Sequence, residues 1–386
     1  MASYFYLKSN LPIINIKIWP PTKIAYTLKA VDSQNYKDSR LKISAQVKAY
    51  DISERVLSGS RQNSGLVLGW IPFWDQDTAF ATFKQNADLF THVSLFWYLL
   101  RSDGSVKKYI YAQEDTSIIN FARARGVKVL ALVANLPDED EGGDWDAARV
   151  NKVISSEAAR KKHVTDLVNL AKKHNFDGIN IDYEALKGYQ KTSFTLFIKD
   201  LANNLHQNGK ILAVALHPKP RENDPAYSNG SQAQDWEKLA GYADQLHLMT
   251  YEQHWETSGP GPISAVPWVR SILDYAKKLI PSYKLFAGVP LYGYDWGGSA
   301  KAEGLTYQEV QNLIKRYKPK IVWDASAKTY HFSYIVGGIS HAVWYEDDAS
   351  FNAKMDLFNE ISVPNVAFWR LGGEDTRVWS SLRNSP

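Results

Sequence analysis

An amide and two acidic residues alternate with apolar residues from Ile179 to Glu184, at the end of the short stretch that begins at Phe176. With the period of two of an extended strand, Asn180, Asp182 and Glu184 fall on one side. The other side is apolar and carries Ile179, Ile181 and Tyr183. Two carboxylates two residues apart on one strand lie about 6.5 to 7 Å apart at the backbone. Crowding of like charges in a partly enclosed site raises the pKa of one carboxyl group, and a glutamate so affected can act as a general acid near neutral pH.

This pattern has a second interpretation, in which the strand lies in an antiparallel sheet and its polar side simply faces water. The flanking sequence favours a buried strand instead. Apolar residues at helical spacing predict one helix over Glu157 to His174 and another over Phe194 to Gln207. A helix, strand, helix order is typical of a parallel sheet covered on its outer face, so we expect the acidic side to point into a barrel or cleft.

The segment from Asp177 to Glu184 reads Asp-Gly-Ile-Asn-Ile-Asp-Tyr-Glu. It resembles the signature of glycoside hydrolase family 18, the chitinases and related N-acetylglucosaminidases, whose usual form is Asp-Gly-x-Asp-x-Asp-x-Glu. The resemblance extends over about Gly65 to Leu382. Within the family, the run from Leu248 to Trp296 is most similar to bacterial spore-cortex and peptidoglycan glucosaminidases. In having Asn at position 180, the chain instead resembles lysosomal chitobiase-like members.

Strand-length apolar runs recur along the chain after a linker-like stretch, and helical stretches separate most of them. The eight runs are Leu66 to Phe73, His92 to Tyr98, Val127 to Ala134, Gly178 to Glu184, Ile211 to His217, Gln245 to Tyr251, Leu285 to Leu291 and Val366 to Leu371. Their alternation with helices predicts an α/β fold, a TIM (β/α)8 barrel, over residues 65–386.

More than seventy residues separate the seventh run from the eighth. We interpret about 297–349 as a small α+β insertion that walls one side of the cleft, and the family resemblance supports an insertion at this place. Its predicted elements are a helix near Thr306 to Tyr317 and strands at Ile321 to Trp323, Tyr330 to Ile335 and His341 to Tyr345.

The active site of a TIM barrel lies at the carboxyl ends of its strands, so the last residues of each run are the candidates. The fourth run ends in Glu184 and the sixth in Met-Thr-Tyr251-Glu. The resemblance implies that Glu184 is the acid/base, that Asp182 orients and polarises the 2-acetamido group of the substrate, and that Tyr251 holds the acetamido oxygen. That oxygen, rather than a protein carboxylate, would attack the anomeric carbon, which makes the reaction retaining and substrate-assisted.

Further substrate contacts are expected near the same strand ends. Trp369, in the eighth run, aligns with the tryptophan that floors the central sugar subsite in the family, and aromatic faces pack on the apolar faces of sugar rings. The expected substrate-binding residues are Asn180, Asp177, Met249, Glu252, Trp369, Tyr292, Trp74 and Asn135. Trp255, Tyr294 and Trp296 are further candidates. For the aromatic residues of both sets, packing in the core is the alternative.

The chain departs from the family pattern at two places. The third run ends in Leu-Val-Ala-Asn135-Leu, without the Ser-x-Gly-Gly that is usual in true chitinases, so we do not expect a long chitin-threading cleft. Asn180 replaces the middle acid of the signature. Because Asn is neutral, Asp182 loses a like-charged neighbour that would otherwise share its proton, and we expect the pH profile rather than the activity to change.

Composition limits the other chemistry that the chain can carry. The 386 residues include no cysteine, which excludes thiol catalysis, cysteine metal sites and disulfides. The nine histidines form no His-Glu-x-x-His pair and no Gly-rich phosphate loop follows a strand, so we expect neither a metal nor another cofactor. The net charge is only +4, and residues 1–60 account for the excess with nine Lys or Arg against four Asp or Glu. The near-neutral remainder argues against nucleic acid as a partner, and we expect a monomer.

Residues 1–64 are predicted to form an N-terminal extension of unassigned role. It contains two short alternating runs, Lys23 to Leu28 and Ile43 to Lys48, before the linker-like stretch. Its first residues lack the charged start and unbroken apolar core of a signal peptide, and no stretch reaches the roughly 18 apolar residues of a membrane span. We nevertheless expect an extracytoplasmic protein, because the polymers that such enzymes cut lie outside the cytoplasm.

The sequence leaves several functions open. It does not distinguish chitin oligomers from peptidoglycan and other polymers of N-acetylglucosamine, because that choice lies in loop shape. An endo-β-N-acetylglucosaminidase acting on N-glycans would use the same residues. A sugar-binding protein on an inactive barrel is the alternative from another class, and the presence of Glu184 argues against it.

Overall fold

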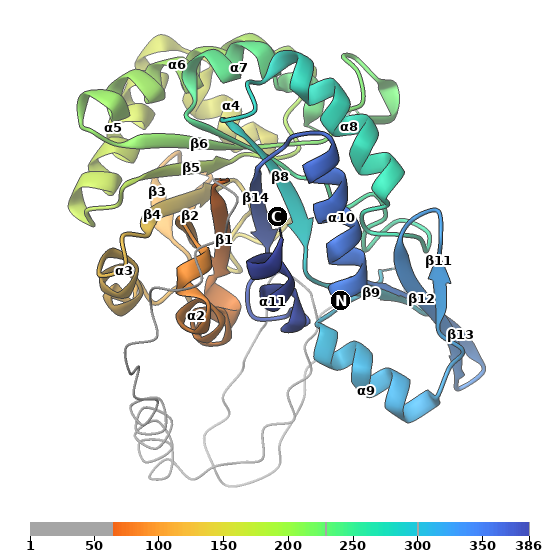
Figure 1. Ribbon diagram of the computed structural model, residues 1–386. Coiled ribbons are helices and arrows are strands. Elements are labelled where there is room, and N and C mark those ends of the chain that lie inside the picture. Colours follow the sequence, from red (N-terminus) through yellow and green to blue (C-terminus); the bar gives the residue numbers. More distant parts are fainter. Residues whose placement is uncertain (1–64, 228–229, 299–300, 386) are drawn as a thin grey trace, which may run out of the picture.

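Parallel strands close into a barrel in the computed structural model (Figure 1), which describes residues 65–227, 230–298 and 301–385. The barrel strands of these described residues are β1 (Val67–Pro72), β2 (His92–Leu100), β4 (Lys128–Ala134), β5 (Gly178–Asp182), β6 (Ile211–Leu216), β7 (Gln245–Leu248), β8 (Leu285–Pro290) and β14 (Asn365–Trp369). β1 pairs in parallel with both β2 and β14, which closes the sheet. The predicted TIM barrel is therefore confirmed.

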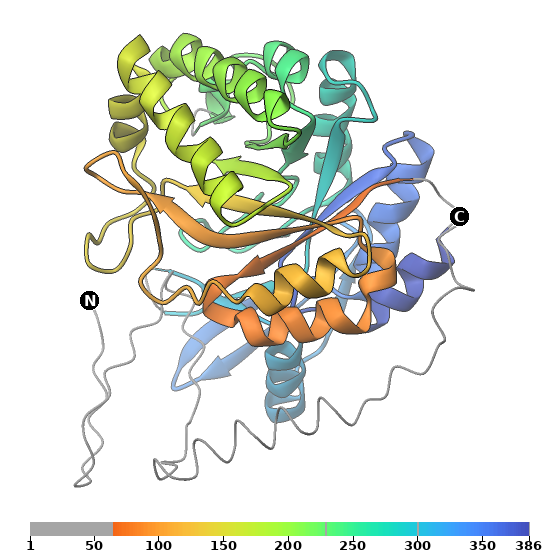
Figure 2. The same ribbon diagram turned by 90° about the vertical axis from the view of Figure 1, so that its left-hand side faces the viewer.

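Helices cover the outside of this barrel, as Figures 1 and 2 show. They are α2 (Gln76–Gln85), α3 (Thr116–Arg123), α4 (Ala147–Ile154), α5 (Glu157–Lys173), α6 (Lys191–Gln207), α7 (Trp236–Tyr242), α8 (Val266–Leu279), α10 (Asp348–Glu360) and α11 (Arg377–Asn384). The helices predicted on either side of the acidic strand are α5 and α6, although α6 begins at Lys191, three residues before the predicted start. The Ser156 side chain caps α5 by accepting a hydrogen bond from the Ala159 backbone N–H.

The alternation along β5 has the predicted consequence for burial. On the helix side, the Tyr183 hydroxyl lies 2.8 Å from His163 Nε2 on α5, and the Tyr183 ring stacks on Phe197 of α6. On the interior side, Asn180 Oδ1 accepts hydrogen bonds from Trp70 Nε1 and the Ser94 hydroxyl. One face of the strand is thus held by the helix layer, while the polar face points into the barrel.

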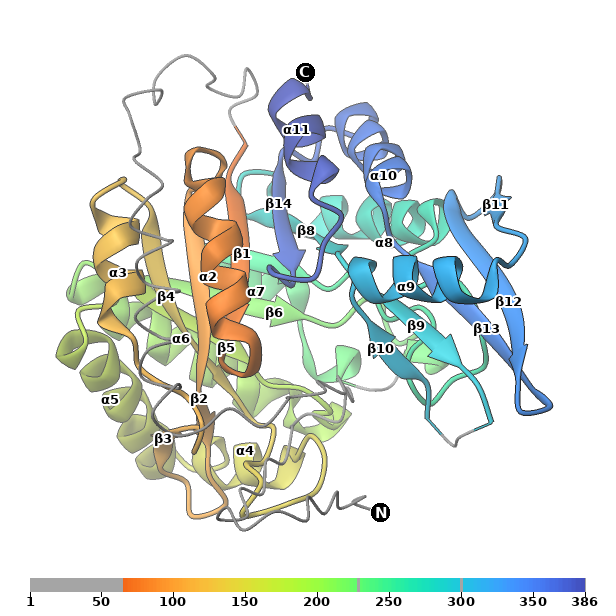
Figure 3. The ribbon, with the colours of Figure 1, turned by 90° about the horizontal axis from the view of Figure 1, so that it is seen from below.

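The insertion between β8 and β14 is a second, antiparallel sheet with one helix on it, and Figure 3 shows it beside the barrel. Its elements are β9 (Gly293–Trp296), β10 (Glu303–Leu305), α9 (Tyr307–Tyr317), β11 (Val322–Asp324), β12 (Thr329–Val336) and β13 (Ile339–Tyr345). A capping box between Thr306 and Glu309 starts α9, and the apolar side of the helix packs on the sheet at Phe332 and Val343. The insertion therefore runs from Gly293 to Tyr345, against the predicted 297–349.

Two features of the insertion and barrel were not predicted from the sequence. β9 and β10 continue the insertion sheet beyond the predicted strands, and β9 pairs with β13 far along the chain. The short β3 (Val106–Lys108) pairs antiparallel with the end of β2 and extends the barrel rim there.

The predicted extension over residues 1–64 lies outside the described residues. Among the residues that the structure does describe, no helix has both the length and the apolar composition needed to cross a bilayer.

Candidate active site

A pocket of about 950 Å³ opens at the carboxyl ends of the barrel strands. Residues that follow β4, β5, β6, β7 and β8 contribute to its lining, together with the end of β14 and loops of the insertion. The catalytic residues expected from the sequence, Asp182, Glu184 and Tyr251, all line it. Of the expected substrate-binding residues, the pocket brings together Trp74, Met249, Glu252, Tyr292 and Trp369.

Glu184 lies just beyond the last residue of β5 and is held there by a side chain from the neighbouring strand. The backbone N–H of Glu184 donates to Asn135 Oδ1 at 2.8 Å, and Asn135 Nδ2 donates to the Glu184 carbonyl oxygen at 2.9 Å. Asn135 is fully buried, so its amide continues the β4–β5 pairing past Asp182, where the regular ladder ends. This arrangement fixes the backbone from which the Glu184 carboxyl group enters the pocket.

The two carboxyl groups at the end of β5 favour the protonated state. Burial raises the pKa of Asp182 to about 7, and one of its oxygens, Oδ1, has no hydrogen-bond partner among the described residues. Burial also raises the pKa of Glu184 well above its ordinary value, with further increases from the charges of Asp182, Glu252 and Asp144. A glutamic acid that keeps its proton near neutral pH is suited to protonate a leaving group.

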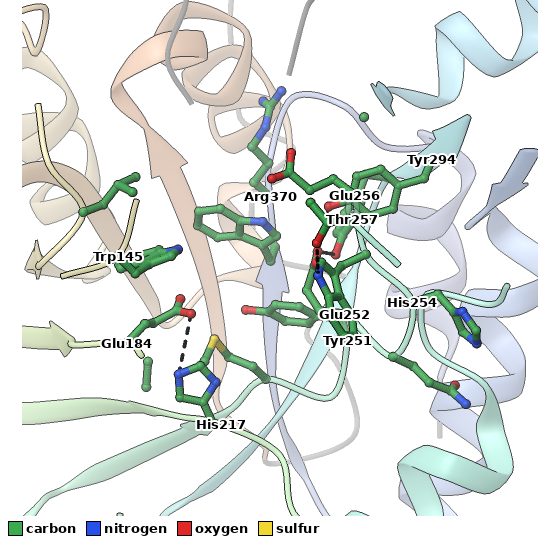
Figure 4. A pocket seen from close by; sticks show the side chains of 18 of the residues that line it. Trp145, Glu184, His217, Tyr251, Glu252, His254, Glu256, Thr257, Tyr294 and Arg370 are labelled. Carbon is green, nitrogen blue, oxygen red and sulfur yellow. Dashed lines mark hydrogen bonds and ion pairs between the residues drawn. The ribbon is translucent and has the colours of Figure 1, made fainter. Parts of the chain in front are cut away.

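Tyr251 follows β7 and points its ring into the pocket, as Figure 4 shows. The glycine at position 288 leaves room for this ring, because a Cβ there would lie 2.8 Å from Tyr251 Cε1 and 2.6 Å from the Leu248 carbonyl oxygen. Burial, and then the nearby carboxyl groups, raise the pKa of Tyr251 well above its ordinary value. The hydroxyl group therefore stays protonated and can donate a hydrogen bond.

Glu252, the next residue, turns its carboxyl group toward the insertion. It adopts a left-handed backbone conformation with φ 60°, and its Oε1 accepts hydrogen bonds from the hydroxyl groups of Tyr292 and Tyr294. Burial raises the pKa of Glu252 to about 7, although the two tyrosine hydrogen bonds act in the opposite direction. This cluster joins the pocket to β9 of the insertion.

Aromatic rings form another part of the pocket wall. Trp369 at the end of β14 contacts Trp70, Trp74 and Phe96, with ring centroids 5.8, 6.2 and 6.1 Å away. Trp369 is only partly buried, whereas its neighbour Phe368 is fully buried on the helix side. The candidates Trp255 and Tyr294 also line the pocket, but Trp296 packs behind it in a small apolar cluster.

Three residues expected to contact substrate, Asp177, Asn180 and Asn135, do not line the pocket. Asp177 precedes β5, so it lies at the opposite, amino end of the barrel, where its carboxylate accepts a hydrogen bond from the Val129 N–H at 2.8 Å. Asn180 is fully buried and lies two residues before Asp182 on the same face of β5. Asn135 holds the Glu184 backbone and is itself covered.

His217, whose ring lies beside Glu184, was not among the residues expected from the sequence. His217 follows β6, and its Nε2 atom is 3.6 Å from Glu184 Oε2. Its position as the last residue of a predicted strand was a usable signal. Asp144 and Trp145 also line the pocket, but they come from the loop between β4 and α4, for which the sequence has no periodic pattern.

A TIM barrel with two carboxyl groups of raised pKa at the end of one strand, in a pocket walled by aromatic rings, is typical of a glycoside hydrolase. Residues 69–374 match the model of the glycosyl hydrolases family 18. The chain therefore belongs to this family.

Individual relatives agree with this assignment. The chain is 29% identical to an uncharacterized glycosylase, YvbX, of Bacillus subtilis over 71% of its own length and 79% of the relative's. It is 25% identical to a cortical fragment-lytic enzyme of Bacillus anthracis, covering 76% of this chain and 67% of the relative.

Solved structures resemble the fold over most of the chain. The spore cortex-lytic enzyme SleL of Bacillus megaterium superposes with a TM-score of 0.75 at 26% identity, covering 93% of this chain and 86% of that one. A chitinase from Chromobacterium violaceum gives a TM-score of 0.74 at 27% identity, covering 83% and 99%.

Proposed function

We propose that this glycoside hydrolase cleaves β-linked N-acetylglucosamine glycans with retention of configuration, by a substrate-assisted mechanism. The observation that carries the proposal is the pair of carboxyl groups at the end of β5: burial raises the pKa of Glu184, and the buried Asp182 beside it has an Oδ1 atom without a hydrogen-bond partner among the described residues. Substrate-assisted members of this family are an exception to the rule that retaining glycosidases use a carboxylate nucleophile.

In the first step, Glu184 donates its proton to the glycosidic oxygen as the bond between that oxygen and the anomeric carbon breaks. The carbonyl oxygen of the 2-acetamido group attacks the anomeric carbon, which forms an oxazolinium ion. Asp182 acts in its ionised form, in which Oδ1 accepts the acetamido N–H and the negative charge offsets the positive charge that develops on this group. The Tyr251 hydroxyl donates to the acetamido oxygen and holds it in line.

In the second step, the Glu184 carboxylate removes a proton from a water molecule, whose oxygen attacks the anomeric carbon. The oxazolinium ring opens, the acetamido group is restored, and Glu184 is protonated again. Two inversions at one carbon give net retention. Trp369 stacks on the sugar in the central subsite.

For the polymer, we propose peptidoglycan or chitin oligomers. The names of the relatives support this choice, because they include cortical fragment-lytic enzymes, a spore cortex-lytic enzyme and a chitinase. Since these polymers lie outside the cytoplasm, we propose an extracytoplasmic location. We also propose that the protein acts as a monomer. The presence of Glu184 argues against a sugar-binding protein without activity.

The test is digestion of a panel of chitooligosaccharides and purified peptidoglycan by the wild-type protein and Glu184→Gln. We expect soluble products with a new N-acetylglucosamine reducing end, identified by mass, and NMR of early products should show the β anomer. The variant should keep its melting temperature but lose at least about 10²-fold in turnover, the usual contribution of a general acid. Inverted product, or equal turnover in the variant, would contradict the mechanism.

A further inference from the structure

The His217 ring is held against the catalytic acid by contacts that lie outside the pocket. The His217 backbone N–H donates to Gln234 Oε1 at 2.8 Å, and Gln234 Nε2 donates to the Ala215 carbonyl oxygen at 3.1 Å. Gln234 is fully buried. This side chain therefore fixes the backbone of His217 just after β6.

A glycine fixes the ring itself. Gly230 has φ 91°, and a Cβ at this position would lie 2.2 Å from His217 Cδ2 and 2.4 Å from Nε2. Only a residue without a side chain allows the ring to pack so closely on the backbone. The imidazole is confined between this backbone and the carboxyl group of Glu184, toward which it points in Figure 4.

The Nε2 atom of His217 is buried, and it has no hydrogen-bond partner among the described residues. Its distance of 3.6 Å from Glu184 Oε2 exceeds a hydrogen bond in the free protein. Catalytic hydrogen bonds are often long in ligand-free structures and shorten in the reacting complex. Burial lowers the pKa of His217 to about 4, so the ring is neutral at working pH and one of its nitrogens carries a proton.

We propose that His217 is a positioning residue that donates its Nε2–H to the Glu184 carboxylate after the proton has left for the glycosidic oxygen. The opposite tautomer would accept the Glu184 proton and turn it away from the substrate, so only the Nε2–H form is productive. The hydrogen bond stabilises the carboxylate during the step in which it must remain ionised, and it leaves the second oxygen free to face water or substrate.

The other titratable groups around Glu184 act in the opposite direction. They are Asp182 on β5, Tyr251 and Glu252 after β7, and Asp144 in the loop between β4 and α4, and negative charge on any of them disfavours ionisation of Glu184. His217 offsets this effect from the side of β6. The inference rests on the proposed acid/base role of Glu184, but it can be tested without turnover.

The experiment is an NMR titration of the Glu184 side-chain carboxyl carbon in ¹³C-labelled full-length protein, with the signal assigned by its loss in Glu184→Gln. His217→Leu and His217→Ala both remove the hydrogen-bond donor. Either variant can be used for the titration if its cooperative thermal unfolding shows that it is folded. We expect the titration midpoint of Glu184 to rise by about one to two pH units. His217→Gln, whose amide can donate from a similar place, should keep the midpoint within about half a unit of wild type.

A midpoint that stays or falls in the Leu or Ala variant would overturn the proposal, because His217 would then be a spacer or an acceptor. An equal rise in His217→Gln would overturn it as well, since lost packing rather than the lost donor would be the cause. Failure of the proposed function would have a different signature, with no glycan cleaved while the titration midpoints still shift as expected.

Discussion

At the scale of single residues, Asn180 is held in one orientation by its partners. The indole N–H of Trp70 can only donate, so the Asn180 atom facing it at 3.1 Å must be the oxygen, which also accepts from the Ser94 hydroxyl at 3.0 Å. An aspartate at position 180 could accept the same two hydrogen bonds. The chain thus keeps the hydrogen-bonding pattern of an acid at this position without its charge.

Asn180→Asp should therefore move the pH profile rather than abolish activity. A carboxylate at position 180 adds a like charge beneath Asp182, which favours protonation of the Asp182–Glu184 pair. We expect the alkaline limb of the kcat/KM profile to shift to higher pH by about half to one unit. Asn180→Ala is the matched control, because it removes the acceptor without adding charge. It should cost about 1 to 3 kcal/mol of stability and leave the limb in place. An unchanged profile in Asn180→Asp would mean that position 180 is only a hydrogen-bonding spacer.

At the scale of elements, the end of β5 depends on a side chain of the adjoining segment. The regular β4–β5 pairing ends at Ala134 and Asp182, and the Asn135 amide supplies the next pair of hydrogen bonds to Glu184. Glu184 is thus tied to the barrel by hydrogen bonds although it lies outside the ladder.

Asn135→Ala should lower kcat by about 10- to 100-fold, because a small displacement of the acid is enough to cost that much. Asn365→Ala is the matched control at the other end of the barrel. Asn365 is also a buried asparagine bonded to backbone, with its Oδ1 accepting from Leu66 N–H and its Nδ2 donating to carbonyl oxygens that include that of Leu285. Both variants should lose about 1 to 3 kcal/mol of unfolding free energy. Only Asn135→Ala should lose turnover, and an equal loss in both would show that general stability is the cause.

At the scale of the whole molecule, the barrel gathers carboxyl groups from different strands at one end and buries them. Burial raises the pKa of Asp182 from 3.8 to about 7 and that of Glu252 from 4.5 to about 7. The folded protein therefore binds more protons than the unfolded chain between about pH 4 and pH 7. The stability linked to these groups is fully present below about pH 4 and is lost as the pH rises through about 7.

Asp182→Asn should make stability less dependent on pH. The amide has nearly the same shape but cannot ionise. At high pH the variant therefore does not lose the unfolding free energy that the wild type loses when its buried carboxyl group becomes charged. We expect its melting temperature to exceed that of wild type by a few degrees at pH 9 and to differ less at pH 5. Asp356→Asn, on the exposed side of α10, should follow the wild-type curve. Parallel curves for Asp182→Asn and wild type would contradict the expectation.

Much of the barrel was predictable because the signals are local. Alternation around Asp182 indicated which side of β5 faces the interior, and the apolar runs located the barrel strands. The strand-end rule then pointed to Glu184, Tyr251 and Trp369, which the pocket brings together. Each of these predictions depends only on neighbours in the sequence and on the geometry of a strand.

What remained depends on contacts between distant segments. The family signature starts at Asp177, but the direction of β5 places that residue at the far end of the barrel. β9 was not predicted as a strand because it forms by pairing with β13, about fifty residues later. The approach of His217 to Glu184 is set by Gln234 and Gly230, which no local pattern connects to either residue. Period and propensity are local, so the alternation along β5 was enough to indicate which side of that strand faces the barrel interior. Which side chains meet at the barrel mouth could not be predicted in this way, because distances across the mouth depend on closure of the sheet and on the loops that pack over it.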